Sequence, residues 1–411
     1  MSAPQTQWDT NYEWKAVTLL TLGFGLVGLD RWIIAPLFPS MMQDLGLDYQ
    51  ALGNLIGALG LAWGVFAIVA GGLSDRLGRR KILVPAILAF SLLSGLSGFA
   101  HGIASLLVIR ALMGITEGSF CPTSFAATAD ASLPTRRGFN LGVQQSAFPL
   151  FGLALGPIIA TQLLQVVNWR WVFVIVAIPG LILGFLLWKT IREPATVGAN
   201  AKVERAPLKD LMNHRNVKLG MLALMCAMSG IFVLSAMTPN YLVDYLKLTT
   251  VQMGFVTSAI GFGGFAGQVV LPGASDLVGR KNISLIGFAL GAGFLYAFMQ
   301  VGPNPVLLFA LLFVCTFFCF GLLGLITGPI AAEAAPRGLI SSTAGIIIGT
   351  GEIFGGGIAP AIAGNIAQTY GIQHVLTMAL IGLVAGFFVS IFLVETAPRK
   401  VSALNAEAPA A

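Results

Sequence analysis

The sequence predicts an all-helical membrane protein with twelve spans in two halves, and three observations support that prediction. Of 411 residues, 56% are hydrophobic and 10% are charged, whereas a soluble domain carries about 25% charged residues. Apolar runs of about 20 residues, each long enough to cross ~30 Å of hydrocarbon as a helix, recur along nearly the whole chain. Short segments of the first half recur in the second. Because only a helix or a closed barrel satisfies its own backbone hydrogen bonds in lipid, the spans should be helices.

Twelve apolar runs make up the predicted spans, beginning with residues 16–39. This first run is too long and too lightly flanked by basic residues to be a cleaved signal peptide, so it should remain in the mature protein. The other runs lie at residues 52–74, 82–100, 104–128, 139–163, 170–189, 217–242, 252–272, 283–301, 306–329, 342–366 and 374–395.

Basic residues between the spans predict the orientation. Of the 23 Lys and Arg residues, Arg31 and Arg110 lie inside predicted spans, Arg170 and Lys247 lie on one side, and all others fall on the opposite side. Under the positive-inside rule the richer side is the cytoplasm, so both termini should be cytoplasmic. The net charge of +6 is explained by these loops and calls for no nucleic-acid partner.

Similar segments recur at a nearly constant offset, which indicates a duplication. The matching pairs are "GGLSDRLGRRK" at 71–81 with "PGASDLVGRKN" at 272–282, "GPIIA" at 156–160 with "APAIA" at 359–363, and "GLILGF" at 180–185 with "GLVAGF" at 382–387. A polar stretch divides the two copies. The predicted parts are a cytoplasmic N-terminus (1–15), a six-helix bundle (16–189), a linker (190–216), a second six-helix bundle (217–395) and a cytoplasmic, disordered tail (396–411).

The loop between the second and third spans carries a dense motif. Its residues, Gly71, Leu73, Ser74, Asp75, Arg76, Gly78, Arg79, Arg80 and Lys81, fit the G-x-L-x-D-R-x-G-R-R motif of the major facilitator superfamily. The second-half copy keeps Asp276, Gly279, Arg280 and Lys281. The chain therefore resembles, over residues 15 to 396, transporters with two six-helix halves around a central cavity. The resemblance implies a monomer in which this loop is a gating latch that does not touch the substrate. A plain turn with stop-transfer charges would not explain why the glycine and aspartate spacing occurs twice.

Five ionisable residues lie at membrane depth. They are Asp30 and Arg31 in the first span, Arg110 and Glu117 in the fourth and Glu352 in the eleventh. Each costs roughly 2.5 to 3.5 kcal/mol at a helix centre, so each should face a cavity or another polar group. In the superfamily fold the first and fourth spans line the cavity, which implies that their four charges converge there. A purely structural salt bridge is the alternative for Asp30 and Arg31, and a hydrogen bond to nearby backbone is the alternative for Glu352.

These charges resemble one branch of the superfamily, the anion:cation symporter family, which includes galactonate and hexuronate carriers. That family carries an Asp-Arg pair in the first span, here Asp30-Arg31, and R-x(6)-E followed by proline in the fourth, here Arg110, Glu117 and Pro122. The resemblance implies Arg31 and Arg110 as anion ligands or electrostatic organisers. It implies Asp30 and Glu117 as protonation sites, and Glu352 is a further candidate for coupling. Gln144 or Gln145 in the fifth span is implied as a substrate contact.

The chain departs from that branch just before the Asp-Arg pair. Sugar-acid carriers usually have Asn-Tyr at these positions, whereas this sequence has Val27 and Gly28. The change removes polar contacts suited to hydroxyl groups and favours an aromatic or short aliphatic carboxylate. The apolar walls of such a site could come from Phe148, Phe232, Tyr241 and Phe320, although a core or lipid contact is the alternative for each.

The sequence thus predicts a proton-coupled symporter that imports an organic carboxylate across the cytoplasmic membrane: a sugar acid, an aromatic acid or a short monocarboxylate. An anion exchanger or a drug exporter of the same fold is the alternative. An enzyme is not expected, because His101, His214 and His374 are far apart and no nucleophile set or phosphate loop is visible. No metal is expected at Cys315 and Cys319, which no His or acid accompanies. The proton is the only coupling ion expected, and no cofactor is.

Overall fold

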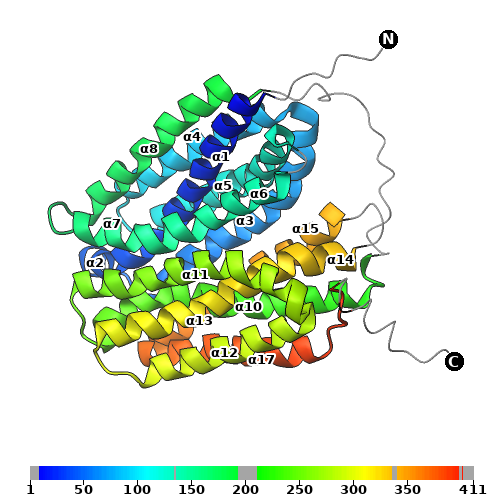
Figure 1. Ribbon diagram of the computed structural model, residues 1–411. Coiled ribbons are helices and arrows are strands. Elements are labelled where there is room, and N and C mark those ends of the chain that lie inside the picture. The colour runs from blue at the N-terminus through cyan, green and yellow to red at the C-terminus, as the bar shows by residue number, and fades with distance from the viewer. Residues whose placement is uncertain (1–8, 134–135, 193–210, 336–339, 398–399, 401–411) are drawn as a thin grey trace, which may run out of the picture.

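The computed structural model describes residues 9–133, 136–192, 211–335, 340–397 and 400. Its helices form two bundles that pack side by side (Figure 1). Helices α1 to α8 make the first bundle, and α10 to α17 make the second. Within this described part, twelve helical segments are long and apolar enough to cross a membrane, as the sequence predicts.

The first bundle contains six spans. Two of them are built from several pieces, because the first bends at Ile33 and the fifth includes a π-helical segment, η1. The elements are α1 (Thr10–Trp32), α2 (Ile34–Leu45), α3 (Tyr49–Leu77), α4 (Arg79–Ser97), α5 (Ile103–Ala131), α6 (Arg137–Pro149), η1 (Leu150–Leu155), α7 (Gly156–Leu163) and α8 (Trp169–Thr190).

The second bundle repeats this plan with its own interruptions. The elements are α10 (Arg215–Asn240), η2 (Tyr241–Tyr245), α11 (Thr250–Val278), α12 (Arg280–Gln300), α13 (Pro305–Leu325), η3 (Ile326–Ile330), α14 (Ala331–Ala334), α15 (Ile340–Gly351), η4 (Glu352–Ile358), α16 (Ala359–Tyr370), η5 (Ile372–His374) and α17 (Val375–Ile391).

The first helix starts earlier than predicted. Asp9 caps α1 by accepting a hydrogen bond from the Tyr12 N–H at 3.0 Å, so the helix runs through polar residues before the apolar run begins. Residues 10–15, which were predicted as an N-terminal segment, are therefore helical. Most of the predicted linker and the tail from residue 401 lie outside the described residues.

Matching irregularities in the two bundles support the duplication. Gly78 joins α3 to α4 with φ 104°, and Gly279 joins α11 to α12 with φ 110°. Both angles lie in the region that only glycine adopts readily. Each bundle therefore uses a glycine to make the tight turn between these two helices. The π-helical segments η1 and η4 also occupy corresponding spans, the fifth and the eleventh.

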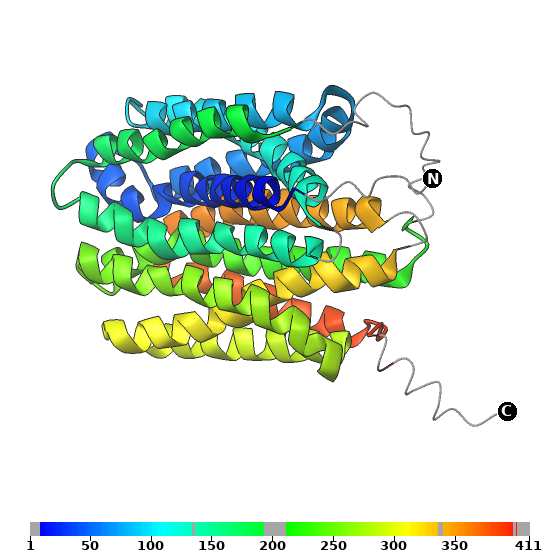
Figure 2. The ribbon, with the colours of Figure 1, turned by 45° about the horizontal axis from the view of Figure 1, so that its top comes forward.

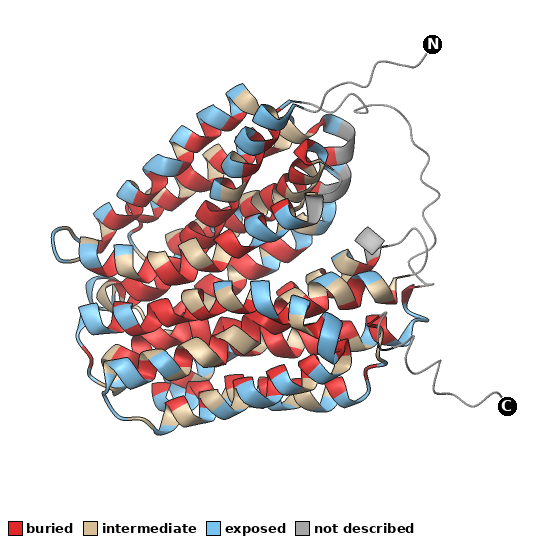
Figure 3. Ribbon diagram, in the orientation of Figure 1, coloured by how far each residue is buried: buried red, intermediate tan, exposed pale blue. Residues whose placement is uncertain are grey.

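The buried residues run along the inside of both bundles and between them, while exposed residues lie on the outward helix faces (Figure 3). Many of the exposed residues are large and apolar, such as Ile182 on α8 and Phe388 on α17. A surface of this kind fits a lipid environment, because lipid chains impose no cost on exposed apolar side chains.

Among the described residues, the contacts that close the space between the two bundles lie at one end. We call the face where α1 begins and α17 ends the terminal face, and it lies on the right in Figure 2. Near the opposite face, Tyr49 Oη donates to Asp244 Oδ2 at 3.0 Å, and Asn240 Nδ2 donates to the same oxygen at 3.1 Å. Gly53, at the start of α3, lies directly against the backbone of α16. These contacts seal the opposite face.

Candidate functional site

A cavity of about 230 Å³ lies between the two bundles. Its closed end holds Arg31 from α1 and Glu352 from η4, and Arg31 Nη2 donates to Glu352 Oε2 at 3.0 Å. From this pair the lining continues toward the terminal face, to Phe125 near the end of α5 and Gly345 near the start of α15. The cavity therefore opens toward the terminal face and ends at an ion pair that bridges the two bundles.

Three aromatic rings surround the Arg31 guanidinium. Its central carbon lies 4.8 Å from the ring centre of Phe232, 5.6 Å from that of Trp63 and 5.8 Å from that of Trp32. These rings attract the cation through their faces and shield it from water, which strengthens its interaction with any anion. Arg31 Nε has no hydrogen-bond partner among the described residues.

Arg110 does not line the cavity. It lies inside the first bundle, where Nη1 donates to the backbone oxygens of Asp30 at 3.1 Å and Arg31 at 3.3 Å. Helix α1 ends at Trp32, and the last carbonyls of a helix need partners from outside it. Arg110 therefore holds the end of α1 and so fixes where Arg31 projects.

Asp30 also points away from the cavity. Its Oδ1 accepts a hydrogen bond from Ser94 Oγ at 2.8 Å, inside the first bundle. Adjacent helix positions face different directions, so Asp30 and Arg31 diverge. The predicted convergence of four charges in the cavity is therefore wrong for this structure: Arg31 alone of the four lines it, and its partner is Glu352.

Glu117 on α5 is fully buried. Neither of its carboxyl oxygens has a hydrogen-bond partner within the described part of the chain. The carboxyl interacts electrostatically with four other charged residues: Asp30, Arg31, Arg110 and Glu352. The charge of Glu117 therefore affects the Arg31–Glu352 pair, although Glu117 makes no hydrogen bond to it.

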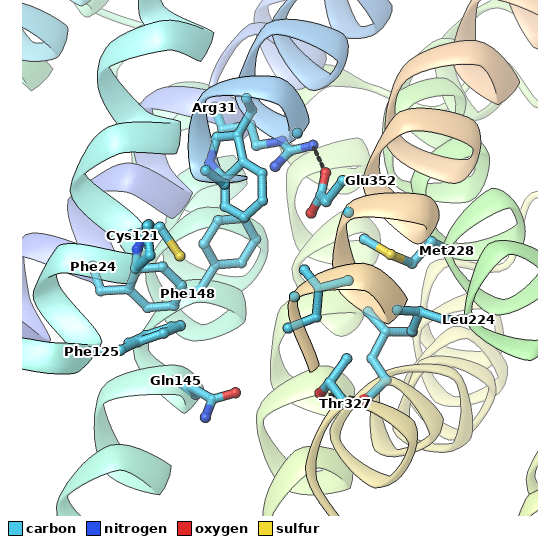
Figure 4. Close-up of a pocket in the computed structure, with 18 of the residues that line it drawn as sticks. Phe24, Arg31, Cys121, Phe125, Gln145, Phe148, Leu224, Met228, Thr327 and Glu352 are labelled. Atoms are coloured by element: carbon cyan, nitrogen blue, oxygen red, sulfur yellow. Dashed lines mark hydrogen bonds and ion pairs between the residues drawn. The ribbon is translucent and has the colours of Figure 1, made fainter. Parts of the chain in front are cut away.

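The cavity wall on the first bundle is aromatic. Phe24 lies with its ring centre 4.9 Å from that of Phe125 and 5.4 Å from that of Phe148. Figure 4 shows these three rings on one side of the cavity, with Met228 and Leu224 on the other. Three predicted wall residues do line the cavity, namely Phe148, Phe232 and Phe320.

Other predicted contacts divide between cavity and core. Gln145 lines the cavity, whereas Gln144 is buried within the first bundle and its amide has no partner among the described residues. Tyr241 does not line the cavity, which contradicts its prediction as a wall residue. Its ring packs 6.1 Å from that of Phe298 inside the second bundle, because η2 lies at the sealed end.

Arg79 fixes the first motif loop, between α3 and α4. Its Nε donates to Asp130 Oδ2 on α5 at 3.2 Å, and its Nη1 donates to Ser74 Oγ at 2.9 Å. The Arg80 guanidinium lies 5.5 Å from the ring centre of Trp188. The side chains at the other predicted latch positions, Gly71, Asp75 and Arg76, lie outside the described residues.

The second motif loop, between α11 and α12, has the same construction. Arg280 pairs with Asp276 at 2.6 Å and with Glu333 at 2.8 Å, and it also donates to Ser275. Glu395 accepts from the Arg280 N–H at 2.8 Å. Sequence reasoning missed Asp130 and Glu395, because nothing in the motif points to acids that are distant in the chain.

Sequence reasoning also missed several cavity residues. They are Phe24, Trp63, Phe125, Met228 and Gln268. With 28 phenylalanines in the chain, no local signal separates those that line a cavity from those that face lipid. The sequence also gives no signal for the hydrogen bonds among Tyr49, Asn240 and Asp244 that seal the opposite face.

Comparisons with known proteins agree with this architecture. A family model described as Major Facilitator Superfamily matches residues 20–348 and 221–410. A hexuronate transporter of Bacillus subtilis (strain 168) is 28% identical over 374 residues, which cover 88% of this chain and 84% of that protein. A gallate transporter of Pseudomonas putida is 29% identical over 317 residues, covering 68% of this chain and 69% of that protein.

Among solved structures, the fold is similar to a bacterial homolog of the human lysosomal transporter Spinster in an inward-facing, unoccupied conformation. The TM-score is 0.77 at 16% identity, and the match covers 92% of this chain and 97% of that one. At this identity the likeness concerns the fold alone.

Proposed function

The chain belongs to the major facilitator superfamily and is a multi-pass membrane transporter, not an enzyme, and we propose that it imports an organic carboxylate together with protons. The observation that carries the proposal is Arg31, a buried guanidinium at the closed end of the cavity. Guanidinium groups bind carboxylates through two parallel hydrogen bonds. Similarity to transporters named for hexuronate and gallate, both organic acids, supports this choice.

The proposed proton sites are the three buried acids. A charged carboxylate without a partner is very costly in a buried site, and protonation removes that cost. Glu117, whose oxygens have no partner among the described residues, is the first such site. Asp30 and Glu352 are the others, since each can exchange its present partner for a proton. Gln145 and Arg110 are proposed as a substrate contact and as an electrostatic organiser.

The proposed cycle is alternating access about the ion pair. We place the protein in the cytoplasmic membrane with the terminal face inside, as the distribution of basic residues favours. The cavity opening then corresponds to an inward-open state. Release of the anion and the proton to the cytoplasm restores the Arg31–Glu352 pair, and the empty carrier returns to the outside. We propose that one chain suffices for this cycle.

The test is Glu117→Gln in proteoliposomes, assayed with labelled benzoate, gluconate and glucuronate. Exchange of the transported compound across the membrane should continue, because Arg31, the proposed anion ligand, is unchanged. Accumulation driven by a proton gradient should fall at least tenfold, because the variant cannot carry the proton. Asp48→Asn is the matched control, since Asp48 is exposed and asparagine caps a helix equally well.

Undiminished gradient-driven accumulation in Glu117→Gln would refute Glu117 as the proton site. If the unaltered protein exchanges carboxylates without any response to a proton gradient, the alternative function of an anion exchanger is indicated. Transport of cationic drugs with no carboxylate transport would indicate the exporter and overturn the role given to Arg31.

A further inference from the structure

We infer that the transported anion is a compact monocarboxylate with an apolar ring and few hydroxyl groups. The inference rests on the proposed function and selects one class among the carboxylates that it allows. Three features of the cavity carry it: the wall, the supply of polar partners and the count of cations.

The wall offers flat apolar surfaces from both bundles. Phe24, Phe125 and Phe148 form one cluster on the first bundle, and Phe232 and Phe320 line the second. Ring faces and edges pack favourably against another ring at centre separations of about 4.5 to 7 Å. A planar ligand that enters from the terminal face would lie between these surfaces with its carboxylate toward Arg31 (Figure 4).

The supply of polar partners is small. Among the described lining residues, charged, amide or hydroxyl side chains come only from Arg31, Gln145, Gln268, Thr327 and Glu352. Arg31 and Glu352 bind each other, and the Thr327 hydroxyl donates to the Leu323 carbonyl at 2.8 Å. With a ligand carboxylate on Arg31, the partners left for other substituents are the two glutamine amides, the Glu352 carboxyl and the Trp63 Nε1–H, which has no partner among the described residues.

This supply is too small for a polyhydroxylated sugar acid, whose several hydroxyl groups each need a donor and an acceptor. Most of those hydroxyls would lose their water without a replacement, and buried groups without partners oppose binding strongly. The glutamines also lie away from the closed end: Figure 4 places Gln145 on the far side of the aromatic cluster from Arg31. A hydroxyl next to the carboxylate would meet the rings of Trp63 and Phe232, which flank Arg31 and offer a single N–H donor, Trp63 Nε1.

The count of cations selects a single carboxylate. Arg31 is the one cationic side chain among the described residues that line the cavity, and Glu352 lies beside it. A second carboxylate on the ligand would have no cation to meet and would be repelled by Glu352 when that residue is ionised.

Binding of matched compounds to the purified full-length protein tests the inference. The probes are benzoate and cyclohexanecarboxylate, gluconate and glucuronate as polyhydroxylated acids, phthalate as a dicarboxylate, and benzamide as a ring without charge. Binding is followed by thermal shift and confirmed by competition in the vesicle exchange assay. We expect benzoate and cyclohexanecarboxylate to bind at least tenfold more tightly than the other four.

Phe125→Leu is the diagnostic variant, because it removes a cavity ring but keeps an apolar side chain. It should weaken benzoate binding on the order of three- to tenfold and leave cyclohexanecarboxylate less affected. Phe388→Leu makes the same change on the outer surface, where Phe388 is 58% exposed, and should have no effect on either compound.

The outcomes separate this inference from the proposed function. Tight binding of gluconate or glucuronate with weak binding of benzoate would overturn the substrate class and leave carboxylate transport standing. Binding of benzamide as tight as that of benzoate, or of no carboxylate at all, would overturn both. Equal effects of Phe125→Leu and Phe388→Leu would show that the aromatic wall does not contribute.

Discussion

Arg31 and Glu352 are the residues on which the site depends. Their side chains are 2% and 7% exposed, and each is the other's charged partner at 3.0 Å. Breaking a buried ion pair by removing one member leaves an uncompensated charge, which is strongly unfavourable. A substrate carboxylate can replace Glu352 on Arg31 without that penalty if Glu352 takes up a proton. Under the proposed function, ionised Glu352 therefore competes with the substrate carboxylate for Arg31.

This competition predicts the behaviour of Glu352→Gln. In the unaltered protein, the Kd for benzoate should rise as pH rises, because more Glu352 becomes ionised and occupies the guanidinium. The variant lacks that competitor, so at alkaline pH it should bind benzoate about tenfold more tightly, or ~1.4 kcal/mol. Its Kd should also change less with pH. Isothermal titration at several pH values measures both effects.

Asp48→Asn, an acid-to-amide change far from the cavity, is the control for that experiment and should leave the pH profile unchanged. Weaker binding by Glu352→Gln, or an unaltered pH profile, would show that Glu352 supports the substrate instead of competing with it.

Glycines determine how the elements α3 and η4 meet. Gly57 of α3 lies against Gly357 of η4, and Gly60 lies against Gly356. A Cβ built on Gly60 would overlap the carbonyl group of Gly356, so no other residue permits this approach. Small residues of this kind let membrane helices pack with their backbones close together. The same contact positions Glu352, the first residue of η4, opposite Arg31.

Gly60→Ala should therefore force α3 and η4 apart. We expect a lower unfolding temperature in detergent, by roughly 1 °C for each kcal/mol lost in a chain of this length, and weaker benzoate binding because Glu352 and Arg31 shift. Gly293→Ala is the matched control, since a Cβ there would meet no other atom within 4 Å. An unfolding temperature equal to that of the control would mean that the interface adapts without cost.

At the scale of the whole molecule, the two bundles must separate at the sealed face for the cavity to open there. The Tyr49–Asp244 hydrogen bond crosses between the bundles at that face, and Asn240 supports it by donating to the same carboxylate. These bonds exist only while the seal is closed, so they bias the equilibrium between the two open states.

Tyr49→Phe removes the hydroxyl that bonds across the two bundles. It should shift the equilibrium toward the state in which the face that is sealed in this structure is open. Loss of one hydrogen bond worth about 1 kcal/mol corresponds to roughly a fivefold change in population. Distance measurements between spin labels on the two bundles would report the shift. Tyr245→Phe, on an exposed tyrosine of the same segment η2, is the control. Identical distance distributions in the two variants would rule out this bond as part of the gate.

The sequence alone was sufficient for the twelve spans, the two matching motif loops and the positions of the ionisable residues within the spans. These features are local, because hydropathy and motifs can be recognised along a continuous stretch of chain. It also identified Arg31 and Glu352 individually. It did not pair them, and it assigned Arg110, Asp30 and Tyr241 to a cavity that they do not line.

Which side chains share the cavity depends on how the helices of the two bundles pack, and no local pattern predicts it. Arg31 and Glu352 are 321 positions apart in the chain, and their meeting depends on how each helix is rotated about its axis. In a membrane helix both the lipid side and the packed side are apolar, so the sequence carries little periodic signal for that rotation. Val27 and Gly28 show the consequence, because neither lines the cavity, and Gly28 instead lies against the backbone of Phe148. The apolar character of the cavity comes from rings on α1, α3, α5, α6, α10 and α13, which only the packing of the two bundles brings together.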